Sequence, residues 1–386
     1  MAAGREKGWS HVLMLAFCHA MSDFYATAST PLVETFKSSF RLSTVGVSVI
    51  GALFGIFGSM MQPLLGLWSD RTDRGALAAL GLLVSAVFIG LMGLAPNAVV
   101  LTLLLIVGGL GVAAFHPGSA VLVVRGEVPR GLAMAVFMTG GGIGLALAPW
   151  VVTGIVDEVG ASWLWVIMPA GVALSGALYL ATRGEARAAA PPKFDWRALF
   201  ARGAGPMWAL FGMASVRALA VVSFTFYVSL LGKNRGWGLG RTGSALSWFM
   251  ACGVVGNLLG GYLAERMGRR LLMAGSCLLA APFFFVFAAS SGPLSIPAFG
   301  VAGLLFSLAN PVNVSLAQEL RPQNASMVSG VMMGLAWGTA SVLLLAVGAL
   351  AEAISLETTL RIMAVLAGLA AVFVAFLPAE GEIAAE

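Results

Sequence analysis

Charged side chains are scarce in this chain. Asp, Glu, Lys and Arg together make up 10% of its 386 residues, whereas 59% are hydrophobic. Soluble domains carry about 25% charged residues, so this composition excludes an ordinary soluble fold. The three cysteines, Cys18, Cys252 and Cys277, all lie in apolar stretches. They imply no disulfide framework and give no basis for thiol chemistry.

Signatures of ATP-driven and enzymatic chemistry are also missing. No G-x-x-x-x-G-K-[ST] stretch occurs, so ATP is not the driving force. The chain lacks paired carboxylates, a Ser/His/Asp set and metal-ligand spacing, so we predict no catalytic residue, metal site or cofactor. A membrane-embedded enzyme or lipid scramblase is therefore the least favoured function class. The net charge of +5 comes from basic residues scattered in short loops, which does not indicate a nucleic-acid partner.

Apolar runs longer than about 18 residues recur along the chain, as in transmembrane helices. The runs are unbroken, which excludes the alternating pattern of a membrane β-barrel. The 49 glycines allow close helix approach in a bilayer. We predict an all-α membrane protein with twelve transmembrane helices, near residues 9–36, 43–68, 75–95, 98–124, 131–156, 162–182, 207–232, 242–265, 271–290, 294–318, 323–351 and 358–377.

One long polar connection divides these spans six and six. We predict an N-terminal six-helix half over residues 1–182, a cytoplasmic linker over 183–206, and a C-terminal six-helix half over 207–386. With the N-terminus inside, fifteen of the 22 Lys and Arg residues fall on the inner side and six on the outer side. The positive-inside rule then places both termini in the cytoplasm of a cell whose inner (plasma) membrane holds the protein.

One charged stretch follows the second span of each predicted half. The two stretches are GLWSDRTDRG at 66–75 and GYLAERMGRR at 261–270. They resemble the loop signature of the major facilitator superfamily, G-x-x-x-[DE]-[RK]-x-G-[RK]-[RK]. The matching residues are Gly66, Asp70, Arg71 and Arg74 in the first stretch, and Gly261, Glu265, Arg266, Gly268, Arg269 and Arg270 in the second. The resemblance implies a major facilitator fold of two pseudo-repeated halves, a monomer, and a small-molecule substrate bound between the halves.

The resemblance also implies a role for the charged stretches. In facilitator-like proteins the loop carboxylate pairs with arginines and with the N-terminal dipole of a neighbouring helix. Such contacts hold one state of the alternating-access cycle, so the two stretches are predicted conformational latches. The alternative is that their charges only enforce topology and solvate a loop.

A narrower resemblance rests on four stretches: CHAMSDFYATASTPL at 18–32, FHP at 115–117, RGLAMAVFMTGGGIGLALAP at 130–149 and AQELRPQNASMVSG at 317–330. These are similar to the fosmidomycin-resistance group of drug exporters. The similarity implies proton-coupled export of a small organic molecule or drug. The alternatives are a proton- or anion-coupled importer of a small organic acid, and a transporter of lipids or lysolipids.

Polar side chains at bilayer depth are functional candidates by default. Asp23 lies near the middle of the first predicted span, four residues after His19, so both side chains share one helix face. Burial favours the neutral form of a carboxylic acid, which makes Asp23 a predicted proton carrier, with His19 and His116 as its partners. A hydrogen-bonded structural aspartate is the alternative. Glu34 and Glu319 lie near span ends, where water reaches them, and are weaker candidates.

Arg217 is the one base placed deep in a predicted span. It either attracts an anionic group of the substrate or forms an internal pair. Neutral hydrogen-bonding groups complete the predicted substrate-binding set: Gln62, Asn257, Asn310 and Asn313. His116–Pro117 in the fourth span and Asn310–Pro311 in the tenth are predicted helix breaks in corresponding places, which points to the binding region.

Overall fold

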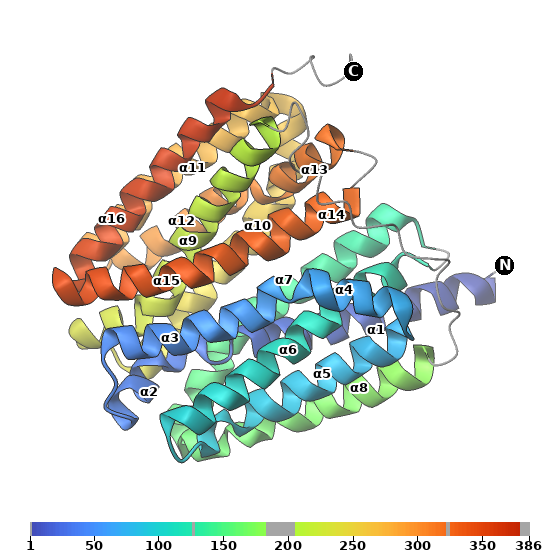
Figure 1. Ribbon diagram of the computed structural model, residues 1–386, viewed down its shortest axis with the longest axis horizontal. Helices are drawn as coiled ribbons and strands as arrows, with labels where there is room; N and C mark the ends of the chain where they lie inside the picture. Colours follow the sequence, from blue (N-terminus) through green and yellow to red (C-terminus); the bar gives the residue numbers. More distant parts are fainter. Residues whose placement is uncertain (1, 126–127, 183–204, 322–324, 379–386) are drawn as a thin grey trace. The chain divides into compact units, whose positions relative to one another are not determined.

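The computed structural model describes residues 2–125, 128–182, 205–321 and 325–378 (Figure 1). Helices dominate these residues, and none of the described residues lies in a strand. The predicted linker, 183–206, lies outside the described part except for its last two residues, which open a helix.

The helices before the linker include short 3-10 segments that adjoin neighbouring helices, and a π-helical segment, η2. They are α1 (Ala2–Thr27), η1 (Thr30–Leu32), α2 (Val33–Ser39), α3 (Thr44–Gly55), η2 (Ile56–Met60), α4 (Gln62–Arg71), α5 (Arg74–Gly90), η3 (Leu91–Leu94), α6 (Ala98–Val123), α7 (Arg130–Val159), η4 (Ala161–Ile167) and α8 (Met168–Thr182).

The helices after the linker include a second π-helical segment, η7. They are α9 (Gly205–Asn234), α10 (Leu239–Met267), α11 (Arg269–Ala289), α12 (Ser295–Ser307), α13 (Asn310–Leu320), α14 (Ala325–Gly330), η7 (Val331–Leu335), α15 (Ala336–Ala353), α16 (Leu356–Leu369) and η8 (Ala370–Phe376).

The chain divides into two compact units. Unit 1 comprises Met1–Arg41, Leu53–Pro192 and Gly238–Ser247; unit 2 comprises Leu42–Ala52, Lys193–Trp237 and Trp248–Glu386. The start of the second predicted span, Leu42–Ala52, therefore belongs to unit 2. The start of the eighth, Gly238–Ser247, belongs to unit 1.

Eleven helices or continuous helical runs in the described part are long and apolar enough to cross a membrane. They follow the predicted second to twelfth spans closely, for example Ala98–Val123 for the predicted 98–124. The predicted first span, α1, is not among them, because its histidines, Asp23 and a charged start reduce its apolar character. A chain of this pattern is an all-α membrane protein, as predicted.

The structure differs from the prediction at the end of the first span and at Pro117. The first span, predicted to reach residue 36, ends at Thr27, and Pro31 lies in the short turn η1. The tenth span divides into α12 and α13 directly before Asn310–Pro311, as predicted. By contrast α6 continues through Pro117. That proline removes a single backbone donor, while the long packing of α6 on α5 holds the helix together.

In unit 1, α1 packs against α7 and α6, which sets the geometry of the polar cluster described below. Glycine makes the contact with α7 close. A Cβ at Gly140 or Gly144 would collide with the backbone carbonyls of Ala16 and Ala20 on α1. Two backbones approach this closely only where no side chain intervenes, as is usual for helix pairs in bilayers.

In unit 2, α9 packs against α15 and α16, and α11 packs against α12 and α16. Aromatic stacking joins α9, α10, α11 and α12. The Phe287 and Phe299 rings stack with centroids 4.0 Å apart, and the Phe249 and Phe299 rings with centroids 4.3 Å apart. Phe224 of α9, the helix that carries Arg217, joins this aromatic core by stacking on Phe284 with centroids 4.5 Å apart.

Candidate functional site

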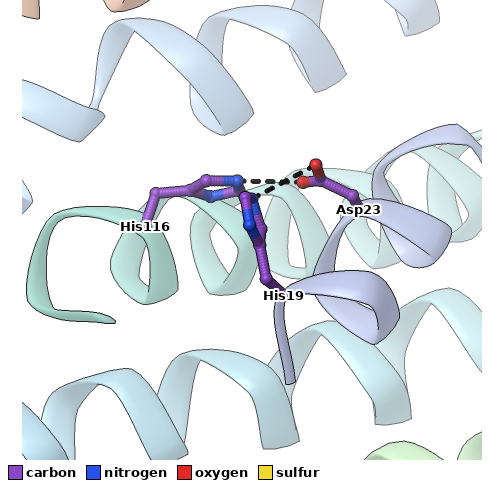
Figure 2. A group of neighbouring side chains, drawn as sticks. All are labelled: His19, Asp23 and His116. Atoms are coloured by element: carbon purple, nitrogen blue, oxygen red, sulfur yellow. Dashed lines mark hydrogen bonds and ion pairs between the residues drawn. The ribbon is translucent and has the colours of Figure 1, made fainter. Parts of the chain in front are cut away.

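Three polar side chains of unit 1 meet between α1 and α6. His19 and Asp23 lie one turn apart on α1, and His116 reaches them from α6 (Figure 2). The Nε2 atom of His116 lies 2.9 Å from Oδ1 of Asp23, and Nε2 of His19 lies 3.3 Å from Oδ2. The side chains of His19, Asp23 and His116 are 4%, 13% and 24% exposed, so the cluster is shielded on the His19 side and more open at His116.

Backbone carbonyls hold the other nitrogen of each ring. His19 Nδ1 lies 2.8 Å from the carbonyl oxygen of Phe137 on α7, and His116 Nδ1 lies 2.8 Å from that of Val112. A carbonyl oxygen only accepts hydrogen bonds, so each Nδ1 carries a hydrogen. This assigns the tautomer of both rings and turns both Nε2 atoms toward the carboxylate, as Figure 2 shows.

With these tautomers, the number of protons that the cluster holds decides whether each contact between a histidine and Asp23 is attractive. With hydrogen on Nδ1, a neutral imidazole presents a lone pair at Nε2, and an ionised carboxylate also presents only lone pairs. The 2.9 Å bond between His116 and Asp23 therefore requires a proton between the two atoms. The 3.3 Å approach of His19 becomes attractive when a second proton is present. Loss of protons turns each contact into one between two acceptors.

Both histidines contact this carboxylate, His116 at 2.9 Å and His19 at 3.3 Å. The neighbouring surfaces are apolar. The His19 ring stacks on the Phe137 ring with centroids 4.0 Å apart, and Phe115 lies 6.0 Å from His19. The rings of the cluster thus lie against aromatic side chains, while the hydroxyls of Thr27 and Ser119 donate to the backbone carbonyls of Asp23 and His116 at 3.1 Å each.

A transition-metal ion accepts ligands of these residue types, and the three donor atoms all lie within 4.8 Å of one another. In the structure the donors are in direct contact across the hydrogen bond between His116 and Asp23. Hydrogen bonds therefore account for the grouping of the three side chains.

Gly141 on α7 makes room for the carboxylate. A Cβ at this position would lie 2.5 Å from Oδ2 of Asp23 and 2.7 Å from Nε2 of His19. Phe137, one turn earlier on α7, supplies both the carbonyl that binds His19 and the ring on which it stacks. The helix α7 is therefore the third wall of the site.

Arg217, on α9 of unit 2, is buried, with 5% of its surface exposed. Its Nη1 donates to Ser276 Oγ at 3.1 Å and to Cys277 Sγ at 3.2 Å. Its Nη2 donates to Asn310 Oδ1 at 3.0 Å and to the carbonyl oxygen of Phe306, whose ring centroid lies 4.1 Å from the guanidinium carbon. Among the described residues no carboxylate pairs with it. Neutral dipoles and a π face compensate the charge.

The remaining predicted substrate-binding residues divide into two kinds. Asn310 joins Arg217 to Asn257, because its Nδ2 donates to Asn257 Oδ1 at 3.0 Å, and both asparagines are exposed. Asn313 is buried and donates to the Met332 sulfur at 3.7 Å. Gln62 donates to the carbonyl of Gly58 one turn earlier at 3.1 Å. The structure therefore groups Asn257 and Asn310 with Arg217 and leaves Asn313 and Gln62 apart from that group.

The first charged stretch lies at the turn between α4 and α5. Asp70 Oδ1 accepts from Arg74 Nη2 at 2.6 Å and from Arg74 Nε at 3.2 Å. Asp73, which replaces the glycine of the family signature, caps α5 by accepting from the Ala76 amide at 3.0 Å. Gly66 lies against Pro117 of α6, and Arg71 ends α4 as an exposed side chain.

The second stretch is arranged differently. Arg269 pairs with Glu319 at the end of α13, whereas Glu265 is exposed and has no partner in the described part of the chain. Arg270 donates to the Val374 carbonyl at 3.2 Å, and the Arg266 guanidinium lies 4.5 Å from the Tyr262 ring centroid. Gly261, in α10, is exposed. The acid that meets this stretch is thus Glu319, a weaker candidate in the sequence analysis.

The chain belongs to the Major Facilitator Superfamily. The model of this family matches residues 12–344 and 231–384. The membership confirms the resemblance carried by the two charged stretches and the predicted fold class. It makes the protein a transporter of the membrane, with a small molecule as its substrate.

Two curated proteins are similar along nearly the whole chain. The uncharacterized MFS-type transporter YfnC of Bacillus subtilis (strain 168) is 26% identical over 97% of this chain and 91% of its own. The fosmidomycin resistance protein of Escherichia coli (strain K12) is 24% identical over 91% of this chain and 89% of its own. The second is consistent with the narrower resemblance to that group.

Solved structures share the fold. A bacterial homolog of the human lysosomal transporter Spinster, in an inward-facing and unoccupied conformation, has a TM-score of 0.80 and 16% identity over 95% of this chain and 96% of its own. A mutant of the nucleoside transporter NupG has a TM-score of 0.76 and 15% identity over 95% of this chain and 100% of its own. At these identities the likeness concerns the fold alone.

Replacing Gly141 by Ala tests the packing of the site. The added Cβ meets the Asp23 carboxylate and the His19 ring, so we expect overpacking to destabilise the protein by about 1–3 kcal/mol. Gly154, on the same helix, is the matched control, because a Cβ there meets nothing within 4 Å. Thermal unfolding of both purified variants should show a lower Tm for Gly141→Ala alone. Equal Tm values would contradict the close approach.

Glu319→Gln tests the second charged stretch. It removes the partner of Arg269, so we expect substrate turnover to slow by about two- to fivefold, the scale of an exposed ion pair. Glu265→Gln makes the same chemical change on an unpartnered side chain and should slow turnover less. Transport rates at equal expression decide the comparison. A larger effect at Glu265 would show that turnover depends on that carboxylate instead.

Proposed function

We propose that the protein is a proton-coupled antiporter that exports a small organic molecule or drug. Family membership supplies the class of secondary transporter, and the proton coupling rests on the cluster of His19, Asp23 and His116. The similarity to a fosmidomycin resistance protein supports efflux and drug resistance as the physiological role. We infer a monomer in the inner membrane with both termini in the cytoplasm, in accordance with the distribution of Lys and Arg.

One observation carries the proposal: both histidines turn Nε2 to the same carboxylate, because backbone carbonyls hold both Nδ1 atoms. When a proton is present, His116 of α6 and Asp23 of α1 form a hydrogen bond. When it is absent, two acceptor atoms face each other and the contact is repulsive. Proton binding and the position of a helix are thereby linked. An antiporter needs this link, since one ligand shifts an equilibrium only through a difference in free energy between two states.

A cycle follows from this link. Protons entering from outside bind the cluster and close the contact between His116 and Asp23. Release to the other side opens it and frees α6 to move relative to α1 within unit 1. In the same cycle the charged stretches act as latches that stabilise one state, as we infer from the pairs Asp70–Arg74 and Arg269–Glu319.

Asp23→Asn tests the coupling. Asparagine keeps the shape and hydrogen bonding of the side chain but has no carboxylate to protonate. We expect uphill transport driven by a pH gradient to fall at least about 100-fold, the usual scale for removing a proton-transfer group. Counterflow of substrate without a gradient should persist, because it needs no net proton transfer. Both assays are made on one purified variant in proteoliposomes.

His11→Gln is the matched control for this test. His11 lies on the same helix, where its Nε2 is 3.2 Å from the Leu122 carbonyl, away from the cluster. It should leave both assays close to wild type. Uphill pumping by Asp23→Asn would place the proton site elsewhere or the coupling on another ion. Loss of folded protein in Asp23→Asn would identify Asp23 as a structural residue.

A second candidate function is an importer of a small organic acid. The buried cation Arg217, which has no acidic partner in the described residues, favours it. Arg217 Nη2 donates to Asn310, which in turn donates to Asn257, so the positive charge lies close to this exposed pair of asparagines. An anionic group bound at these asparagines would gain from the charge of Arg217 without breaking its four hydrogen bonds.

Arg217→Gln separates the two candidates. If the charge attracts substrate, we expect the apparent KM to rise about tenfold more for anionic substrates than for neutral ones. Arg217→Lys keeps the charge and should preserve the preference for anions, with some loss of stability. Initial transport rates over a series of organic acids and neutral drugs give the answer. An equal change for both classes would mean that Arg217 is only a structural residue of unit 2.

A further inference from the structure

An open groove of about 310 Å³ lies on the surface of unit 2, between α11 and α16. Its lining is apolar apart from a threonine and one arginine: Phe285, Thr358, Arg361, Ile362, Val365 and Leu366. Phe285, Ile362 and Val365 are 43%, 37% and 53% exposed, although both helices are apolar enough to span a membrane. Exposed apolar side chains on spanning helices meet acyl chains rather than water.

Arg361 places a positive charge at this groove, and no carboxylate among the described residues forms an ion pair with it. Its Nε is buried and has no hydrogen-bond partner among the residues that the structure describes, while the residue as a whole is only half-buried. Glu357, one turn earlier, is the expected partner of an arginine at this spacing. Its carboxylate instead accepts from Asn234 Nδ2 at 2.9 Å. An anion in the groove would therefore be attracted by the positive charge of a guanidinium that is half-buried in an apolar lining.

A second arginine makes the end of the groove positive. Arg235 donates to the carbonyls of Phe287 and Ala288 at 2.7 and 2.9 Å, next to the end of α11. Burial lowers the pKa of Arg235, Glu357 opposes this shift, and Arg361 adds to it. Two guanidinium groups therefore act together against one carboxylate, and the local charge is net positive.

The depth of Arg361 matches a lipid headgroup. It lies five residues into α16, which is about 8 Å along the helix axis. A long basic side chain near the end of a spanning helix extends to the headgroup region while its stem lies along apolar surface. The apolar walls continue from there along Ile362 and Val365 toward the membrane interior.

We propose that this groove binds a phospholipid with a net anionic headgroup. The phosphate pairs with Arg361, and one acyl chain lies against Phe285, Ile362 and Val365. A zwitterionic headgroup brings its own cation to a site that already has two, so it binds more weakly. This site is separate from the His19, Asp23 and His116 cluster and does not depend on the proposed transport function.

Native mass spectrometry of the full-length protein in detergent tests the proposal. Phosphatidylglycerol and phosphatidylethanolamine with identical acyl chains are titrated in parallel. We expect the wild type to retain phosphatidylglycerol about tenfold more strongly, the scale of a charge-assisted hydrogen bond. Arg361→Gln should abolish this preference. Val365→Trp, which fills the exposed groove without changing charge, should reduce the binding of both lipids.

Lys37→Gln is the control for net charge, because it removes one positive charge from α2, in unit 1. It should leave the preference unchanged. Equal loss in Lys37→Gln and Arg361→Gln would overturn the site in favour of a general charge effect. Displacement of the lipid by millimolar inorganic phosphate would show a site for free anions instead. If Arg361→Gln does not fold, unchanged lipid binding by Val365→Trp overturns the proposal on its own.

Discussion

A carboxylate at bilayer depth is costly unless its charge is compensated, and Asp23 contacts two histidine rings that can compensate it. The carbonyls of Phe137 and Val112 hold those rings by Nδ1, so both Nε2 atoms must meet the carboxylate. The protons in the cluster then decide whether His116 is attracted or repelled. His19 and Asp23 lie on α1 and His116 lies on α6. The same protons therefore influence how closely these two helices pack.

Unit 2 compensates a buried charge in another way. Arg217 has neutral acceptors and an aromatic face where Asp23 has titratable partners. A guanidinium does not lose its proton in a protein, so the charge of Arg217 is constant, whereas that of the Asp23 cluster can change. A constant cation suits the attraction of an anion, and a variable charge suits proton coupling. This physical difference separates the two sites into the two roles that we propose.

The sequence alone predicts the three polar side chains of the cluster better than it predicts the residues that surround them. Spacing along one helix pairs His19 with Asp23, and His116 is predicted as their partner because it is a polar side chain at bilayer depth in the fourth span. The sequence does not single out Phe137 or Gly141, because which of the 49 glycines faces a carboxylate depends on how α7 lies against α1. The run of three glycines that contains Gly141 was the available signal. The extent of most spans was predictable because the bilayer dictates the length of an apolar helix.

The two charged stretches show how one signature accommodates different residues. At the turn into α5, Asp73 caps the helix with its side chain. At the matching turn into α11, Gly268 adopts a φ of 85°, a backbone conformation that glycine reaches without strain. The ion pairs differ as well. Asp70 and Arg74 span a single turn, whereas Arg269 and Glu319 join α11 to α13. Within the described residues of these stretches, only the latter pair joins helices that are not neighbours in sequence, so the two stretches are stabilised in different ways.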